Sequence, residues 1–315
     1  MSRKHWVLLG LLVALLLLIA LPRLMPQRKD YPDRLAVVDT SLVSRMIISK
    51  GADSLQVERI GAGWRLTTPV SWPADPRTVA GLLDVLGDLK VTALANPNPK
   101  LTADPDYDLD VGRVLRLRVF QGDQAALDLR LGRSSRDFSG SFVRLEDQEA
   151  IYRLAAEIGS RVPTGRGRWL DKVICRENAD SLVHIEVRRA EGLLSFECAD
   201  STWGVQWKPV RGSGWSAPKV NEVPFEDLKS ALCNLRMSDL PTPAQTAALA
   251  VAAPAFSHVL VLKDGRCQVY QWITLEGEEN LAFVRREGQA GGFAVYRGLM
   301  DRLTVAPEEF KPASP

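Results

Sequence analysis

This sequence contains few histidines and cysteines and has no clear surplus of positive or negative charge. Each of these features argues against a class of function. The 315 residues include only three histidines, and 40 basic residues nearly balance 38 acidic ones, for a net charge of +2. A nucleic-acid-binding surface needs a clear basic surplus, so that class is not expected. No GxSxG, HExxH, Walker A or GxGxxG pattern occurs in the sequence. The sequence therefore predicts a protein that is not an enzyme, with no catalytic residue, no cofactor and no metal site.

The four cysteines give no sign of a metal site either. They lie far apart, without a CxxC or CxxH pair, so zinc binding is not expected. An even number of cysteines in an exported protein permits one or two disulfides, whereas free thiols are common in apolar segments. Both alternatives stay open for Cys175, Cys198, Cys233 and Cys267.

One long apolar run is present, at the N-terminus. Residues 6–25 contain a single charged side chain, Arg23, and a helix over them would span ~30 Å, the thickness of the hydrocarbon core of a bilayer. The small residues that a signal peptidase needs are not both present. We therefore predict an uncleaved anchor over residues 1–25, held in the cytoplasmic membrane by residues 6–25, and a linker over residues 26–34. Basic residues flank the run on both sides, so charge alone leaves the orientation open.

Residues 35–165 and 181–305 share one order of predicted elements. Each stretch begins with short alternating strands, continues with an amphipathic helix and ends in a β-meander. Asp75 and Pro76 are typical of a helix start, as cap and first helical residue. Near its end the first stretch reads "SFVRLEDQEAIYRL", and the second reads "AFVRREGQAGGFAVYRGL".

These patterns predict an α+β fold. An N-terminal transmembrane helix would precede two similar units, each a mainly antiparallel β-sheet with one main amphipathic helix. Residues 166–180 would form a basic linker between the units, and residues 306–315 a C-terminal tail.

Exposed arginine and tryptophan side chains are the best candidates for contacts with a partner, because tryptophan and arginine are favoured at interfaces. The basic segment could meet anionic headgroups or an acidic protein surface; alternatively, it is a solvated connection whose Trp169 docks on a core. The partner-binding candidates are Arg161, Arg166, Arg168, Trp169, Trp203, Trp207 and Trp215.

Two further segments have alternative interpretations. "GRSSRDFSGSF", residues 132–142, could hold an anion, but its composition equally suits a flexible hairpin connection, which we favour. "DPDYDLD", residues 104–110, lacks the glycine and distal glutamate of a calcium loop, so a solvated acidic loop is the preferred interpretation.

The segments "GWRLTTPVSWPAD", "YDLD", "LRLG" and "FVR…YR", together with the apolar N-terminus, resemble the bacterial domain-of-unknown-function family numbered 4340. The resemblance covers most of residues 35–305, in two copies, and Asp108 stands where the family usually has glycine. Members are often encoded beside ABC-transporter subunits similar to those linked to gliding motility. The resemblance implies an extracytoplasmic domain tethered to a transporter complex, and it brings no catalytic residues.

Three functions remain for comparison. We expect a single-pass, non-enzymatic accessory or scaffold protein of the inner membrane, with a periplasmic domain that binds ABC-transporter subunits or other envelope proteins and no nucleic acid. A small-ligand or lipid carrier is the alternative, and it would need an apolar pocket of ~300–1,000 Å³. A cell-envelope hydrolase that uses Asp104 and Asp108 is less favoured, because alternating residues of one loop position two carboxylates poorly.

Overall fold

The computed structural model describes residues 29–97, 105–109, 114–304 and 306–312. The chain divides into two compact units, Met1–Thr164 and Gly165–Pro315, called unit 1 and unit 2 below. The predicted anchor, residues 1–25, lies outside the described residues, as does the start of the linker. Within the described ranges no helix combines the length and apolarity needed to cross a membrane.

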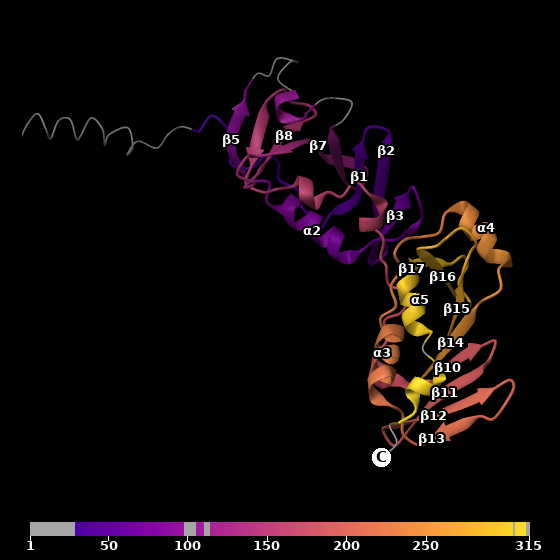
Figure 1. Cartoon of the computed structure of the whole chain (residues 1–315). Coiled ribbons are helices and arrows are strands. Elements are labelled where there is room, and N and C mark those ends of the chain that lie inside the picture. Colours follow the sequence, from indigo (N-terminus) through magenta and orange to yellow (C-terminus); the bar gives the residue numbers. More distant parts are fainter. Residues whose placement is uncertain (1–28, 98–104, 110–113, 305, 313–315) are drawn as a thin grey trace, which may run out of the picture. The chain divides into compact units, whose positions relative to one another are not determined.

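Unit 1 is one antiparallel sheet with a helix on one face (Figure 1). The strand order is β4-β3-β2-β1-β6-β7-β8-β9-β5. The elements are β1 Val43–Lys50, β2 Asp53–Ile60, β3 Gly63–Thr68, β4 Trp72–Pro73, α2 Pro76–Gly87, β5 Val91–Asn96, β6 Leu115–Gln121, β7 Gln124–Ser134, β8 Ser141–Leu145 and β9 Ile151–Leu154. Asp75 caps α2 by accepting a hydrogen bond from the Thr78 amide at 2.8 Å, as the sequence predicts.

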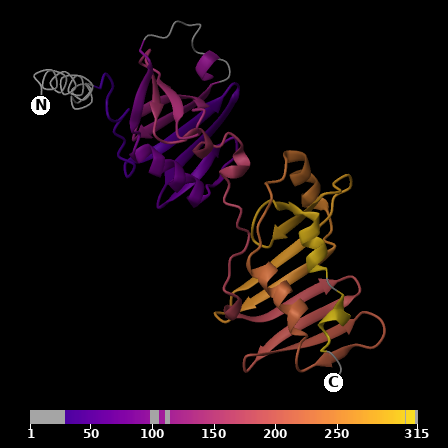
Figure 2. The same ribbon diagram turned by 60° about the vertical axis from the view of Figure 1, so that its left-hand side comes forward.

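Unit 2 repeats this arrangement with eight strands in the order β13-β12-β11-β10-β14-β15-β16-β17. Its helices α3 and α5 lie along one face of the sheet (Figure 2). The elements are β10 Leu182–Arg189, β11 Gly192–Ala199, β12 Thr202–Pro209, β13 Trp215–Ala217, α3 Glu222–Cys233, α4 Pro243–Val251, β14 Phe256–Leu262, β15 Cys267–Ile273, β16 Leu281–Arg286, β17 Phe293–Tyr296, α5 Arg297–Leu303 and the 3-10 helix η6 Pro307–Phe310. Two antiparallel sheets with a few helices confirm the α+β class.

The first four strands, the helix and the meander follow the same connectivity in both units, and the details of pairing agree. The β1–β6 ladder shifts register between Val43 and Arg45, and the β10–β14 ladder shifts at the matching place, between Leu182 and His184. A β-bulge that recurs at one place in two sheets is a feature of the design of the fold rather than a local accident. Positions in the two units can therefore be matched strand by strand.

The segment before the first strand also matches. In unit 1 the Leu35 amide donates to the carbonyl of Leu89, which follows α2; in unit 2 the Ile174 amide donates to the carbonyl of Leu235, which follows α3. Residues 166–180, predicted as a basic linker, thus belong to unit 2. Residues 307–310, predicted as part of a tail, form η6, whose Phe310 is buried against Phe196 with ring centroids 4.9 Å apart.

The similar sequences near the end of each unit, residues 141–154 and 282–299, occupy matching structural positions only in their first parts. Phe142, Val143 and Arg144 match Phe283, Val284 and Arg285, because both triplets occupy the same register of the meander. The two Tyr-Arg pairs do not match: Tyr152 pairs with Val143 inside the sheet, whereas Tyr296 is the residue that caps α5.

A second, smaller core lies on the reverse face of each sheet. In unit 2 it contains Leu249 of α4 with Ile273, Phe283 and Ala294. In unit 1 Leu109, Val114 and Ile151 form the cluster. The Tyr107 ring meets that of Phe142 edge-on at 5.0 Å. Asp108 has φ 57°, a left-handed conformation that glycine adopts without strain.

Candidate functional site

The residues proposed for partner contacts lie in different surroundings. Arg161 is exposed in unit 1, at the end of the 3-10 helix Gly159–Arg161. Arg168 is exposed in unit 2, and Arg166 is half-buried in an ion pair with Asp239 at 3.4 Å. Trp169 has no exposed surface. It is therefore a core residue, as in the alternative interpretation of this segment.

The other three tryptophans gather at one edge of the unit 2 sheet. Trp203 and Trp207 are on β12, and Trp215 of β13 lies directly opposite Trp207. The Trp203 ring packs against Phe225 of α3 with centroids 4.9 Å apart. All three are half-buried. We call this group the tryptophan edge.

The C-terminal segment covers part of the tryptophan edge. The Trp215 indole N–H donates to Glu308 at 3.1 Å, and the Lys311 ammonium lies 4.7 Å from the ring centroid of Trp215. A cation over an aromatic ring and a hydrogen bond from the indole N–H both stabilise the position of a tryptophan side chain. Trp215 is therefore held in place, while Trp207 next to it borders a pocket.

That pocket has a volume of about 500 Å³ and lies between the sheet and the α5–η6 segment. Trp207, Phe256 and Met300 supply large apolar surfaces, and Arg189, Glu191, Arg297 and Asp301 supply charges of both signs. Arg297 and Asp301 form an ion pair at 3.5 Å. An apolar surface with a few charged groups around it is typical of binding sites. The pocket therefore suits a group that has both apolar and polar parts.

The imidazole ring of His258, on the strand that provides Phe256, is buried and makes no hydrogen bond to another described residue. It has no exposed surface, and neither ring nitrogen has a partner among the described residues. Its ring centroid lies 5.3 Å from that of Phe256 and 6.0 Å from that of Trp272, whose indole nitrogen also lacks a partner there. Burial, and secondarily the charge of Arg189, lowers the pKa of His258 to about 3.

The matching positions in unit 1 are apolar. His258 pairs with Tyr270, and the corresponding pair in unit 1 is Leu117 and Leu129. Both leucines are fully buried. Burying an imidazole without partners costs free energy that leucine avoids. Unit 2 therefore carries polar groups where the fold itself needs none, and buried groups with perturbed pKa values gather at functional sites more often than elsewhere.

A second set of buried polar groups, along β15, is fully hydrogen-bonded. Gln268 accepts from the Tyr270 hydroxyl and donates to Glu177 at 2.7 Å, and Glu177 accepts from Arg266 at 3.0 Å. The Cys175 thiol lies 3.7 Å from the Gln268 side-chain oxygen. Burial raises the pKa of the Cys175 thiol and raises that of Cys233 to about 11. All four cysteines are free, and these two are poor nucleophiles because the thiolate form is disfavoured.

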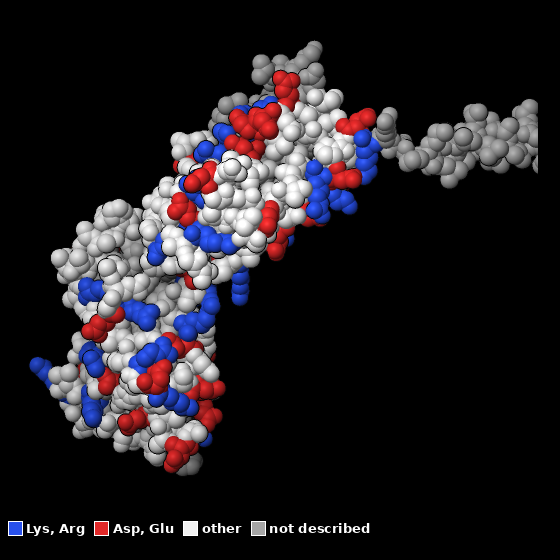
Figure 3. Space-filling model, turned by 180° about the vertical axis from the view of Figure 1, so that it is seen from behind, with Lys and Arg blue, Asp and Glu red and all other residues white. Residues whose placement is uncertain are grey.

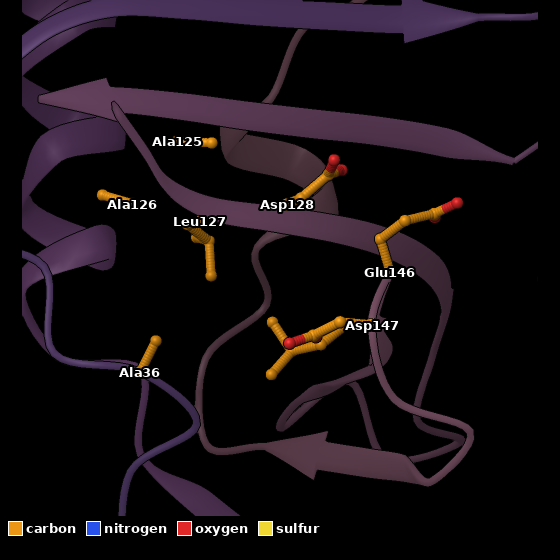
Figure 4. Close-up of a pocket in the computed structure, with 8 residues that line it drawn as sticks. Ala36, Ala125, Ala126, Leu127, Asp128, Glu146 and Asp147 are labelled. Carbon is orange, nitrogen blue, oxygen red and sulfur yellow. The ribbon is translucent and has the colours of Figure 1, made fainter. Parts of the chain in front are cut away.

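Unit 1 has a pocket of about 400 Å³ whose lining is acidic on one side and formed by short alanine side chains on the other (Figure 4). Two of its three carboxylates are already paired, and the third, Asp147, is exposed. Asp128 accepts two hydrogen bonds from Arg116, both 2.7 Å, and Glu146 pairs with Arg130. Arg130 lowers the pKa of Glu146. A general acid needs the opposite shift, so this pocket does not resemble a pair of hydrolytic carboxylates.

The remaining sequence motifs fall outside a shared site. Asp108 is exposed, and Asp104 and Asp110 lie outside the described residues. Among the side chains that the structure describes, no group of three or more could hold a metal ion. Figure 3 shows acidic and basic side chains next to each other on the surface of both units. No surface visible there has charge of one sign alone.

Comparison with known proteins identifies a family. The sequence model of the family described as "Domain of unknown function (DUF4340)" matches residues 64–254. The chain belongs to this family. The match begins within β3 and ends before β14, so it runs across both units instead of covering each unit separately. No curated protein and no solved structure matches the chain.

Proposed function

We propose that this member of the DUF4340 family is a non-enzymatic accessory protein, anchored in the inner membrane by residues 6–25. Its two units would lie outside the cytoplasm and bind subunits of an ABC-transporter-type envelope complex. The observation that carries the binding role is the pocket beside Trp207, whose lining combines large apolar side chains with charged groups of both signs. Interfaces use aromatic anchors of this kind at their centres.

The chemistry of the second unit supports binding over catalysis. Arg297 and Asp301 at the pocket are paired with each other. The buried thiols of Cys175 and Cys233 have raised pKa values, which reduces their reactivity. The family match brings no reaction with it. The large, mostly antiparallel sheets supply rigid surfaces, which suit a protein that positions other proteins.

A small-ligand or lipid carrier is the second candidate. The volume of about 500 Å³ for the Trp207 pocket lies within the ~300–1,000 Å³ typical of ligand sites. Lipid or another ligand would then occupy the pocket between the sheet and α5. The two candidates differ in what the purified protein carries with it, so one preparation can separate them.

The test is purification of the tagged full-length protein from native membranes in mild detergent, with mass spectrometry of both the proteins and the extracted small molecules. Near-stoichiometric transporter subunits support the accessory role. Trp207→Ala should reduce their recovery, whereas Trp72→Ala, a half-buried tryptophan of unit 1, serves as the matched control. Recovery of the protein with a bound small molecule and no partner supports the carrier instead, and recovery with neither contradicts both.

A further inference from the structure

The connection between β7 and β8, residues 135–140, presents an aromatic side chain to solvent. Phe138 is 77% exposed and has φ 54°. Single exposed apolar residues are ordinary on protein surfaces. A left-handed backbone conformation at a bulky residue is uncommon, because the side chain crowds the neighbouring carbonyl. We call residues 135–140 the Phe138 loop.

The Phe138 loop is held by a network of hydrogen bonds. The Asp137 carboxylate accepts from the hydroxyls of Ser135 at 2.6 Å and Ser139 at 2.8 Å, and from Arg153 of β9 at 3.0 Å. The Phe138 amide donates to the carbonyl of Ser135 at 2.9 Å. These contacts fix the backbone in its left-handed turn. The segment predicted as a flexible hairpin is thus an ordered one.

The strain is not explained by packing within unit 1. The Phe138 side chain is largely in water, and a glycine would adopt the same backbone without strain. Strained residues that the surrounding structure holds in place are found at functional positions more often than elsewhere. We therefore expect the side chain of Phe138 to contact something outside unit 1.

The loop lies at the end of the sheet where the chain enters unit 1. Gly140 packs against the backbone of Leu154, since a Cβ added to it would lie 2.0 Å from that carbonyl oxygen. Leu154 pairs with Val91, and the Val91 amide donates to the carbonyl of Asp33 at 2.9 Å. The first described residues of the chain and Phe138 are thus separated by two strands. A membrane that holds the residues before position 29 would lie near this end.

The charges beside Phe138 suit an anionic surface. Arg133 and Arg136 are exposed, and the side chain of neither makes an ion pair or hydrogen bond with another described residue. Asp137, the acidic group of the loop, is already bound to Arg153. An apolar tip flanked by two cations matches the boundary between phospholipid headgroups and acyl chains. A protein partner would not need this pairing of features next to the point where the chain enters.

We propose that the Phe138 loop inserts into the surface of the membrane that carries the chain. Phe138 would lie below the headgroups, and Arg133 and Arg136 would contact lipid phosphates. This inference rests on the anchoring part of the proposed function and adds a second membrane contact, which would restrict the orientation of unit 1 on the bilayer.

The test places an environment-sensitive NBD fluorophore at position 138 of the full-length chain in phosphatidylcholine–phosphatidylglycerol vesicles. Phe138→Cys supplies the attachment point, in a background with Cys198→Ser and Cys267→Ser, since those are the two native thiols that are not buried. The control is Asp123→Cys, in the turn at the other end of β7. The eleven residues of β7 separate the two sites by roughly 35 Å.

A spin-labelled lipid headgroup should quench the fluorophore at position 138 severalfold more than the fluorophore at position 123. Flotation of the same vesicles reports anchoring independently. Vesicles that float with both labels equally exposed to water overturn the loop proposal and leave anchoring intact. Protein that does not float overturns both. A label that is shielded in native membranes but not in pure lipid vesicles also overturns the lipid proposal and assigns the loop to a protein partner.

Discussion

The two ring nitrogens of His258 can be removed by substituting leucine, the residue at the matching position of unit 1. The free energy of unfolding of unit 2 should rise, because a buried polar group without a partner costs about 1–3 kcal/mol. The change in side-chain shape offsets part of this gain, by less than about 1.5 kcal/mol for similar volumes. We therefore expect His258→Leu to stabilise unit 2 by roughly 1–2 kcal/mol at neutral pH.

The pH dependence sharpens this prediction. The pKa of His258 is about 3 in the folded protein, well below its value of 6.5 in an exposed histidine. Between these values the unfolded chain binds a proton that the folded chain does not. Wild-type stability should therefore fall on acidification below pH 6.5, by up to about 1.4 kcal/mol per pH unit. His258→Leu removes this contribution.

The assay is urea unfolding of the full-length chain in detergent at pH 7.5 and pH 5.5, followed by tryptophan fluorescence. Trp169, Trp203, Trp207, Trp215 and Trp272 make the signal report mainly on unit 2. The stability difference between His258→Leu and wild type should widen by about 1 kcal/mol at the lower pH.

His184→Leu is the matched control, because His184 contacts Glu186 at 3.2 Å on the other face of the sheet, and its replacement should not stabilise the protein. A loss of stability in His258→Leu, or a difference that does not change with pH, would refute the reasoning. It would mean that the His258 nitrogens have a partner, such as a bound water, in the folded protein.

Three further substitutions test local features of unit 1. Gly132→Ala should destabilise unit 1 by about 1–3 kcal/mol in thermal unfolding, because the added Cβ would lie 2.2 Å from the carbonyl oxygen of Tyr107. An unchanged melting temperature would mean that the segment around Tyr107 does not pack on β7. Phe138→Gly should stabilise unit 1 by about 0.5–1 kcal/mol in urea unfolding, since left-handed strain outweighs the entropy of glycine; destabilisation would show that Phe138 has an internal packing role. Asp137→Ala should speed hydrogen exchange in the Phe138 loop at neutral pH. Hydrogen bonds from neighbouring serines, and then the charge of Arg153, hold the pKa of Asp137 well below its usual range. The stabilisation that the ionised carboxylate gives to the loop is therefore present above the pKa of Asp137 in the unfolded chain. It is lost as the pH falls through the lower pKa of Asp137 in the folded protein. Equal exchange in both proteins at pH 7 would count against the network.

Local signals predicted the type of sheet and one helix in each unit, α2 and α3, whereas α4 and α5 were not predicted. Asp75 and Pro76 define the start of α2 in the sequence and in the structure, because capping depends only on nearby residues. Alternation along β6 and β7 places their leucines on the buried face. The shared order of elements appears as the same order of eight strands in both sheets, and unit 1 adds β5 at one edge. The predicted anchor lies outside the described residues and stays a prediction.

Features that depend on distant contacts could not be predicted. Docking of Trp169 on a core was one of two alternatives that the sequence left open, and only the structure shows that it is buried, because the carbonyls its segment pairs with follow α3. The Tyr-Arg pairs looked equivalent in the sequence, but strand register assigns Tyr296 to a helix start. The pocket beside Trp207 is formed by side chains from β10, β12, β14 and α5 together. Trp207 was singled out by residue type, whereas only comparison of matched positions distinguishes His258.

The burial of Phe310 has a consequence for the order in which the protein is made. Phe310 packs on Phe196 of β11, and the Asn221 amide before α3 donates to its carbonyl at 2.9 Å. The interior of unit 2 is therefore incomplete until residue 310 has left the ribosome, whereas unit 1 ends at Thr164. During synthesis unit 1 can finish folding first, and unit 2 exposes the apolar ring of Phe196 until its last segment arrives. Chaperones that hold nascent chains would then act on unit 2 longer than on unit 1.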